Sequence, residues 1–574
     1  MNEHHKHLLS QEDKLVSEVD GKKLMEYTAG VAQWVRISGT KEEVESLQYC
    51  QKILDGFGYA TKLVAHPAYI SYPKKSFVEM ESPEAMSFES IAHAFTPTTP
   101  PGGVSAEVVP CDFPSVAGNI VLCSGLASYA EVINLEKQGA VGILYQSDDY
   151  LHNIPVNKFW GPVDEDGEKQ LPKIPVLSVT RASGEIVRGC IAKGRTRLRL
   201  ESVVETGWHD ITRLEADLTI PNTDKFLLFS GHICSWDYGA MDNGSANATM
   251  IECARVLAER RSDFKRSLKL IFWPGHTQGK FVGSVWYADE NFEMLSKNCV
   301  GHVNVDSTGG KDATIIIEAP VMPQTFQLAK DVIKRHAGED FLGKRLGHFA
   351  DQSFYGVGLT STFGTFSEQD ARKVSEDGIT FHGSAAKYAG GLGWWWHTKH
   401  DTIDKVDEAF LVRDTKIYVA TIWRILTQPV LPYRVLDAAK DICDSVAQLQ
   451  KNLDDRFDLS AMAERSGEVM KLAEKFQETL EAGNESETDA GALNEKLHKT
   501  LTLMTRIIFH DNDIFSYDPG GPMTGLPSLA DFQKLATTAI GSHRYYTSLV
   551  KFRRGYNRVM LYLDHIAGML RAES

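Results

Sequence analysis

Histidine and aspartate side chains follow several apolar segments of the chain, at points where buried strands would end. His232 comes after the apolar run Phe226–Ser230 and one glycine, and Asp242 follows it in the polar segment SWDYGAMDNG. Asp306 closes the run VGHVNVD, and His397 follows a run of tryptophans. Imidazole nitrogen and carboxylate oxygen are the ligands that zinc and related divalent ions bind in proteins. Their order predicts a metal site that activates water for attack on a carbonyl group.

His276 lies just after another apolar run, Leu268–Trp273, and its role has several interpretations. As a neutral imidazole it is a good ligand for zinc, manganese or iron. An ordinary pKa of about 6.5 also suits a general base at neutral pH, although a neighbouring cation would lower that pKa. A structural histidine and a remnant of an inactive site are the remaining interpretations. His276 is therefore predicted as a catalytic residue, a metal ligand or both in turn.

Five further residues are candidates for contacts with a substrate, because they lie in loops beside these positions or near strand-like runs: Asp237, Tyr238, Glu368, Trp396 and His400. Each also has a plainer interpretation as a turn, core or surface residue. Asp401 lies shortly after His397 and is expected to fix its loop or orient an imidazole. His302 is expected to be a core or edge histidine.

The elements that must position these residues alternate between strands and helices over residues 206–430. Continuous apolar runs such as LKLIFW are typical of strands that are buried on both faces. We therefore expect an α/β fold with a mixed, mainly parallel sheet and helices on both faces. In such sheets, sites form beyond the carboxyl ends of the strands, which is where the candidate ligands lie.

Two other units flank this one in the sequence. A Pro- and Gly-rich boundary at Thr96–Gly103 precedes a smaller strand–helix alternation over residues 104–205. Residues 431–574 predict a helical bundle, because apolar residues recur at helical spacing, as at Val435, Ala439, Ile442, Val446 and Leu449. The expected domains are thus residues 1–103 and 206–430 for the main unit, 104–205 for an insert and 431–574 for the bundle.

Composition narrows the class of protein. The 574 residues include 61 Lys and Arg against 76 Asp and Glu, a net charge of −15, so neither nucleic acid nor an anionic membrane is an expected partner. No apolar run is long enough to span a membrane, and the first residues lack a secretory apolar stretch. The 8 cysteines form no CxxC pair, which indicates reduced thiols and a cytoplasmic location.

The ordered motifs resemble those of the co-catalytic zinc aminopeptidase family, which includes glutamate carboxypeptidase and the transferrin receptor ectodomain. These motifs are His232 followed by Asp242-Asn243, the glycine-rich segment at Gly275, Asn304-Val305-Asp306 and finally His397-Thr398 with Asp401-Thr402. The segment RISGTKEEVESLQYCQKILDGFGYAT resembles the opening helix of that family. Residues 104–205 resemble its protease-associated insert, and the C-terminal bundle resembles its dimerisation domain.

The resemblance implies specific roles for the candidate ligands. His232, Asp242 and Asp306 would hold one metal ion, and Asp242 would bridge to a second ion that His397 also binds. Asp351 matches a position of the family near the substrate pocket, which makes it a sixth candidate for substrate contact. The Glu-Glu pair of the family, which supplies the general base and a ligand, is replaced here by His276-Thr277 after Gly275. One or two divalent ions are therefore expected, with zinc as the first choice and manganese or iron as alternatives.

The function predicted from these observations is metal-dependent hydrolysis of an amide or peptide-like bond in a small peptide or amino-acid conjugate, by a homodimer. Loss of the Glu-Glu pair keeps two alternatives open. One is a metalloenzyme of another class on the same fold, such as a lyase or a C–N hydrolase. The other is a non-catalytic binding or assembly protein, although such a protein has no physical need for four ligand-type residues.

Overall fold

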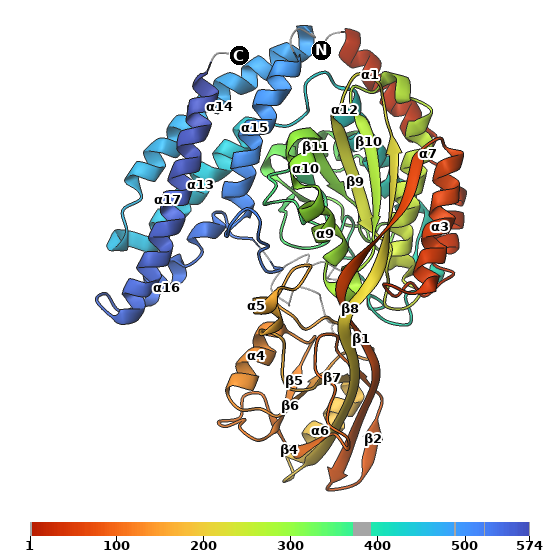
Figure 1. The fold of residues 1–574 in the computed structure, drawn as a ribbon, viewed down its shortest axis with the longest axis vertical. Helices are drawn as coiled ribbons and strands as arrows, with labels where there is room; N and C mark the ends of the chain where they lie inside the picture. Colours follow the sequence, from red (N-terminus) through yellow and green to blue (C-terminus); the bar gives the residue numbers. More distant parts are fainter. Residues whose placement is uncertain (1–2, 371–391, 487–489, 522, 573–574) are drawn as a thin grey trace.

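The computed structural model of the protein describes residues 3–370, 392–486, 490–521 and 523–572. Figure 1 shows three parts: a sheet with helices packed around it, a smaller α/β unit below that sheet, and a group of long helices beside it. Both described ends of the chain lie at the top of the view, far from the smaller unit. The candidate ligands all belong to the first part.

Parallel strands form the centre of the main sheet. β9 (Phe226–His232) lies between β10 (Ser267–Trp273) and β11 (Cys299–Asn304) and is parallel to both. β14 (Ser361–Thr362) continues the parallel arrangement beyond β11. The sheet ends in two short strands on one side, β12 (Pro320–Val321) and β13 (Lys344–Arg345), and in two long antiparallel strands on the other, β8 (Arg197–Leu218) and β1 (Ala60–Ser82).

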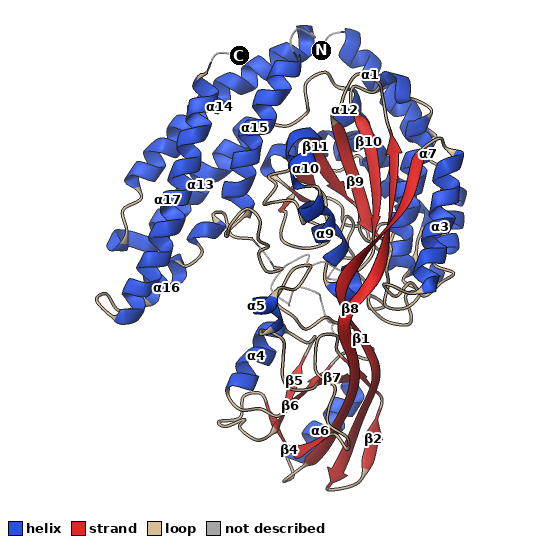
Figure 2. Ribbon diagram, in the orientation of Figure 1, coloured by secondary structure: helices blue, strands red, loops and turns tan. Residues whose placement is uncertain are grey.

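The central strands are apolar throughout because both faces of the sheet are covered. Leu227 and Phe229 of β9 belong to the largest apolar cluster, whereas Phe226 and Leu228 pack into a separate cluster on the other face. Figure 2 shows helices on both sides of these strands. The first face packs against α3 (Lys41–Gly56), α7 (Ala246–Ala258) and α12 (Glu408–Thr427), and the second against α9 (Val282–Glu290) and α10 (Phe292–Asn298).

The smaller unit is joined to the main sheet by β1 and β8, which pair along nearly their whole length and run from one unit into the other (Figure 1). Its parallel strands, in spatial order, are β4 (Val104–Pro110), β5 (Ile120–Ser124), β6 (Gly142–Gln146) and β7 (Val176–Val179). β3 (Ser90–Ala92) pairs with β7, and β2 (Met86–Phe88) pairs with β1. The helices of the unit are α4 (Tyr129–Lys137), α5 (Glu165–Glu168) and α6 (Arg181–Ile191). Strands that precede residue 104 thus pair with this unit, and its exact boundaries stay a prediction.

The C-terminal region is helical, as the spacing of apolar residues predicts. It comprises α13 (Val435–Leu453), α14 (Ser460–Ser486), α15 (Ala490–Phe509), α16 (Phe532–Thr537) and α17 (His543–Arg571). The predicted face of α13, which includes Val435, Ile442 and Val446, is buried. The other α-helices of the described residues belong to the main unit: α1 (Glu3–Ser17), α2 (Gly21–Val31), α8 (His276–Gly279) and α11 (Phe326–Ala337). Within the described residues, no helix combines the length and apolar character needed to cross a bilayer.

The expected fold class is confirmed: a mixed, mostly parallel sheet is flanked by helices on both faces and followed by a helical region. The carboxyl ends of β9, β10 and β11 lie side by side in this sheet, because the three strands are adjacent and parallel. This arrangement brings the polar residues after each strand to one edge of the sheet.

Gly231 is a position where this arrangement depends on a small residue. A Cβ atom there would lie 2.6 Å from the backbone oxygen of Val305, closer than real Cβ atoms approach a backbone atom. We expect Gly231→Ala to push β9 away from the segment after β11 and to lower the free energy of unfolding by about 1–3 kcal/mol. Urea denaturation measures this change. Gly207→Ala on β8 is the control, since a Cβ there meets nothing within 4 Å; equal midpoints for the two variants would contradict the prediction.

Candidate active site

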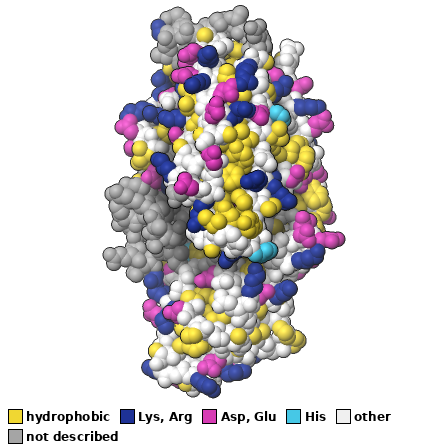
Figure 3. Space-filling model, turned by 90° about the vertical axis from the view of Figure 1, so that its left-hand side faces the viewer, with side chains coloured by type: hydrophobic (Ala, Val, Ile, Leu, Met, Phe, Trp, Pro, Cys, Tyr) yellow, Lys and Arg dark blue, Asp and Glu magenta, His cyan; other side chains and the backbone are white. Residues whose placement is uncertain are grey.

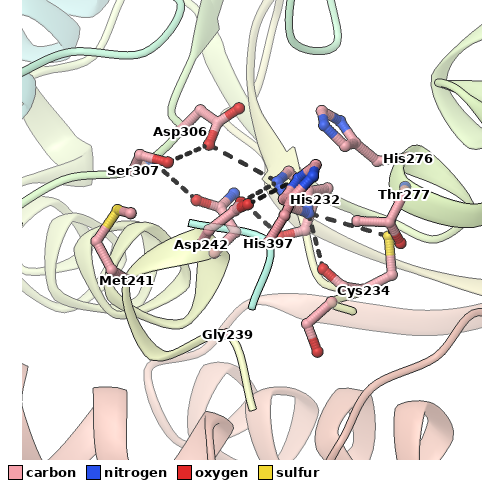
Figure 4. A network of polar contacts seen from close by, with 12 residues as sticks. His232, Cys234, Gly239, Met241, Asp242, His276, Thr277, Asp306, Ser307 and His397 are labelled. Carbon is pink, nitrogen blue, oxygen red and sulfur yellow. Dashed lines mark hydrogen bonds and ion pairs between the residues drawn. The ribbon is translucent and has the colours of Figure 1, made fainter. Parts of the chain in front are cut away.

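The main-sheet edge gathers the predicted ligands into one cluster (Figure 4). His232 is the last residue of β9, His276 begins the short helix after β10, and Asp306 follows β11. Asp242 lies in the turn between β9 and α7, and His397 comes from a loop before α12. Five residues from separate segments therefore meet where the parallel strands end.

Asp242 lies between two imidazoles. One of its carboxylate oxygens is 3.1 Å from His232 Nε2, and the other is 3.2 Å from His397 Nε2. His232 Nε2 is also 3.7 Å from an Asp306 oxygen. All four side chains are almost completely withdrawn from solvent. A carboxylate with one oxygen toward each imidazole can bind one ion or bridge two.

Each imidazole of this cluster has its other nitrogen fixed by a backbone carbonyl. His232 Nδ1 donates to the oxygen of Cys234 at 2.9 Å, and His397 Nδ1 donates to the oxygen of Asn153 at 2.7 Å. A carbonyl only accepts, so Nδ1 carries a proton and Nε2 is the nitrogen that faces Asp242. Hydrogen bonds of this kind orient histidines that bind metal ions.

The charges of the cluster favour a bound cation. Burial alone would lower the pKa of His232, but its contacts with Asp242 and Asp306 raise it well above the ordinary value. Burial would likewise raise the pKa of Asp242, but His232 and His397 hold it far below its ordinary value. Moreover, His232 Nε2 is buried without a hydrogen bond of good geometry among the described residues, although two carboxylates face it. The imidazole nitrogens and carboxylate oxygens are suitable ligands for a divalent ion, whose positive charge would balance the negative charge of both carboxylates.

His276 forms a pair with Asp351 next to this cluster. Its Nδ1 lies 2.9 Å from one Asp351 oxygen, and the other oxygen accepts a hydrogen bond from Ser284 at 2.8 Å. Burial would raise the pKa of Asp351, but the charge and hydrogen bond of His276 hold it below the ordinary value. The His276 ring stacks on that of His232 with centroids 3.8 Å apart, and possible ligand atoms of His232, His276 and Asp306 lie within 4.8 Å of one another. Nε2 is the nitrogen of His276 that remains available to an ion or to water.

The turn that carries Asp242 is held by Asp401. Both Asp401 oxygens accept backbone hydrogen bonds, from Met241 and from Asp242, at 2.9 Å each. Burial raises the pKa of Asp401 to about 7. Asn243 links the same turn to both strand ends, because its side chain donates to the His232 oxygen and accepts from the backbone nitrogen of Ser307.

The smaller α/β unit also contributes to the site, which the sequence interpretation did not predict. The backbone nitrogen of Asn153 donates to the His397 oxygen at 3.0 Å, in addition to the bond that fixes the imidazole. His152, which also contacts Asp148, donates from Nδ1 to the oxygen of Trp396 at 2.6 Å. Residues more than 240 positions apart are joined here, and no local pattern in the sequence marks such a contact.

A cavity of about 260 Å³ opens beside the cluster and is lined by Asp242, His276 and Asp306 together with mainly apolar side chains. The apolar part of the lining consists of Ile154, Pro155, Phe281, Phe349, Ala350, Leu392 and Trp396. Lys280 is the basic residue of the wall, and burial lowers its pKa to about 8. The volume matches a small substrate such as a short peptide or an amino-acid conjugate.

The six candidates for substrate contact have different positions. Trp396 lines the cavity and stacks on His397 with ring centroids 3.4 Å apart. Asp351 binds His276 instead of lining the wall. His400 packs against aromatic rings, and the carboxylate of Glu368 forms an ion pair of 2.8 Å with Lys344. Among the described residues, the cavity wall includes none of Asp237, Tyr238, Glu368 and His400.

Comparison with known proteins gives matches to peptidases. Residues 214–422 match peptidase family M28. A probable glutamate carboxypeptidase from Arabidopsis thaliana is 21% identical over 84% of this chain and 79% of its own length. Carboxypeptidase Q from Bos taurus is 23% identical over 49% of this chain and 66% of its own length, and a probable glutamate carboxypeptidase from Zea mays is matched over only 30% of its length.

Solved structures share the fold. A peptidase M28 precursor from Shewanella amazonensis has a TM-score of 0.55, with 17% identity over 73% of this chain and 95% of that one. An aminopeptidase from Aneurinibacillus has a TM-score of 0.53, with 18% identity over 72% of this chain and 95% of that one. At these identities the likeness concerns the fold alone.

The fold and the cluster together define a metal-dependent hydrolase of peptide bonds. Residues 214–422, which contain all five clustered side chains, match the model of peptidase family M28. The resemblance to zinc aminopeptidases is thereby confirmed, and the comparisons do not favour the lyase or the non-catalytic protein.

His302 lies in the core, as expected, and has a consequence for stability. Its ring nitrogens contact the hydroxyls of Ser230 at 2.8 Å and Ser361 at 3.1 Å, and burial lowers its pKa to about 3. Below pH 6.5 the unfolded chain binds a proton here that the folded chain does not. The stability from this residue is therefore complete above about pH 6.5 and declines as the pH falls toward 3, by up to about 1.4 kcal/mol per unit.

We expect the His302→Gln variant to lose less unfolding free energy than the unsubstituted protein between pH 6 and pH 4, measured by urea denaturation of chelator-treated protein. His7→Gln, at an exposed position, should keep the original slope. Parallel pH profiles for the His302 variant and the unsubstituted protein would show that the imidazole is protonated in the fold.

Proposed function

We propose that this protein hydrolyses an amide bond in a short peptide or amino-acid conjugate, with His232, Asp242 and Asp306 holding a catalytic zinc ion. The convergence of these three side chains at one sheet edge supports the proposal. Three protein ligands and an open position are typical of catalytic zinc. When bound there, zinc would lower the pKa of a water molecule and polarise the substrate carbonyl.

We propose that His276 is the general base. The three ligands form a complete set without it, and its pairing with Asp351 leaves Nε2 free to accept a proton. The carboxylate of Asp351 would keep Nε2 in the accepting tautomer and stabilise the imidazolium once the proton has moved. His276 would then return this proton to the departing amine. It thus takes the place of the first glutamate of the family pair.

A second ion would have fewer protein ligands. In the part of the chain that the structure describes, only the second oxygen of Asp242 and Nε2 of His397 face that side. The Thr277 hydroxyl is already bonded to the side chain of Gln278. Two protein ligands hold an ion more weakly than three, so we propose one tightly bound zinc per chain. Manganese and iron are the alternatives that the same donors accept.

We also propose that the helical region forms a homodimer. Tyr546, Val550 and Leu561 of α17 each expose about half of their side chain. Figure 3 shows the side of the molecule that carries the helical region, where apolar side chains gather among charged ones. Exposed apolar surface of this kind is typical of contact sites between proteins. Light scattering during gel filtration would measure the mass, against 63.8 kDa for one chain.

Separate variants distinguish a ligand from a base. His232→Ala is expected to remove most of the zinc and the activity together. His276→Gln is expected to retain about one zinc per chain but to lower kcat by about 10²–10⁴-fold, the usual contribution of a general base. Metal content is measured by mass spectrometry of the dialysed protein, and turnover with acetylated dipeptides.

Exposed His565, on α17, supplies the matched control, and His565→Gln should retain both zinc and turnover. Loss of zinc from the His276 variant would instead make His276 a ligand. Full turnover by the metal-free protein would overturn the proposed function itself.

A further inference from the structure

Lys280 is a cation in the cavity wall, and it forms no ion pair with a carboxylate of the described residues. Its ammonium group donates to the backbone oxygen of Asn157 at 2.6 Å, and no carboxylate of the described residues lies within ion-pair distance of it. Lys269 provides the contrast, because that lysine is also largely buried but pairs with both Glu215 and Asp217. One neutral acceptor compensates poorly for the positive charge of a cation that is withdrawn from water. An ammonium group also has three N–H groups that can donate hydrogen bonds. Two N–H groups of Lys280 thus remain for a ligand.

The backbone around Lys280 holds it in place. Lys280 and Phe281 both have left-handed conformations, with φ of 50° and 71°, which residues other than glycine rarely adopt. Trp160 of the smaller unit stacks on Phe281 with centroids 4.0 Å apart, and the backbone nitrogen of Gly161 donates to the Lys280 oxygen at 2.8 Å. Lys280 therefore sits between the two units in a conformation that its surroundings maintain, which is common at functional sites.

The remaining wall of the cavity suits an anion and not an amine. Its described carboxylates are Asp242 and Asp306, and both are engaged with His232 in the metal cluster. Among the described lining residues, a substrate ammonium group would therefore find no free acidic partner, and Lys280 would repel it. A carboxylate would gain a charge-assisted hydrogen bond in surroundings that are mainly apolar.

We propose that Lys280 binds a carboxylate of the substrate, so that the enzyme prefers peptides or acylated amino acids with a free carboxylate near the scissile amide over those with a free α-amine. This inference rests on the proposed hydrolysis for its kinetic consequences, but carboxylate binding can be measured without turnover. The apolar wall would receive the side chain of such a substrate.

Calorimetry with an uncleavable pair of probes tests the binding directly. Zinc-loaded protein is expected to bind 4-methylpentanoate at least about 10-fold more tightly than 4-methylpentanamide, the range of a charge-assisted hydrogen bond. Lys280→Met should abolish this preference, whereas Lys280→Arg should retain part of it. Lys41→Met is the control, because Lys41 is exposed and pairs with Glu45 on α3. An unchanged preference in the Met variant would mean that the carboxylate binds elsewhere, for instance to the metal, and would overturn the inference.

Kinetics give the second readout. N-acetyl-L-leucyl-L-leucine is expected to show a KM at least about 10-fold below that of its C-terminal amide, and Lys280→Met should raise KM only for the acid. Faster cleavage of L-leucine 4-nitroanilide than of the acid would overturn the inference. The enzyme could also cleave none of the three compounds and still bind the acid probe more tightly than the amide probe. This result would count against the proposed hydrolysis but would support carboxylate binding by Lys280. If the Met variant does not fold, the unsubstituted protein and Lys280→Arg still test the inference through their relative affinities for the acid and the amide. Equal affinities of the unsubstituted protein for the two probes would overturn it.

Discussion

The carboxylate of Asp242 lies between two imidazoles inside the protein, with an oxygen about 3 Å from each, and a second carboxylate faces one of the same nitrogens. Two carboxylates withdrawn from water are unfavourable unless positive charge compensates them. The imidazoles supply part of that compensation, and their Nδ1 atoms are already committed to backbone carbonyls. A divalent ion bound by these groups would supply the rest, and the surrounding structure holds the four side chains in place for it.

Much of the fold can be understood as support for this cluster. Parallel β9, β10 and β11 place His232, His276 and Asp306 at adjacent strand ends, and close contact of β9 with the segment after β11 is possible because residue 231 is a glycine. Asp401 and Asn243 fix the turn that carries Asp242. The smaller unit closes the opposite side, through Asn153 and through the Trp160–Phe281 stack. The cavity is therefore a product of two units, and its shape depends on how they are joined by β1 and β8.

The replacement of a glutamate pair by His276 and Thr277 changes how the site can handle a proton. A glutamate base carries its own negative charge beside the metal, whereas His276 is neutral until it accepts a proton. Asp351 restores the negative charge one residue further out, where it holds Nδ1 and can stabilise an imidazolium. As the proposed base, the His276–Asp351 pair would thus perform with two side chains what a single glutamate carboxylate would perform alone. The cavity wall also carries the cation of Lys280 and is mainly apolar, so its charge does not favour a free amine.

The sequence by itself determined the central strands of the main sheet, the helical character of the C-terminal region and the identity of the clustered residues, because these depend on local patterns. Phe226–Ser230 and Leu268–Trp273 are apolar enough to require burial on both faces, and the helical spacing of Val435, Ile442 and Val446 predicted a buried face that the structure confirms. Only the tertiary structure decided which neighbours each side chain meets. Asp351 turned out to hold His276, Glu368 pairs with Lys344, and Asn153 reaches His397 from another unit. Such contacts join residues that are far apart along the chain. Their geometry depends on how whole helices and strands pack, and the spacing of residues in the sequence does not reveal it.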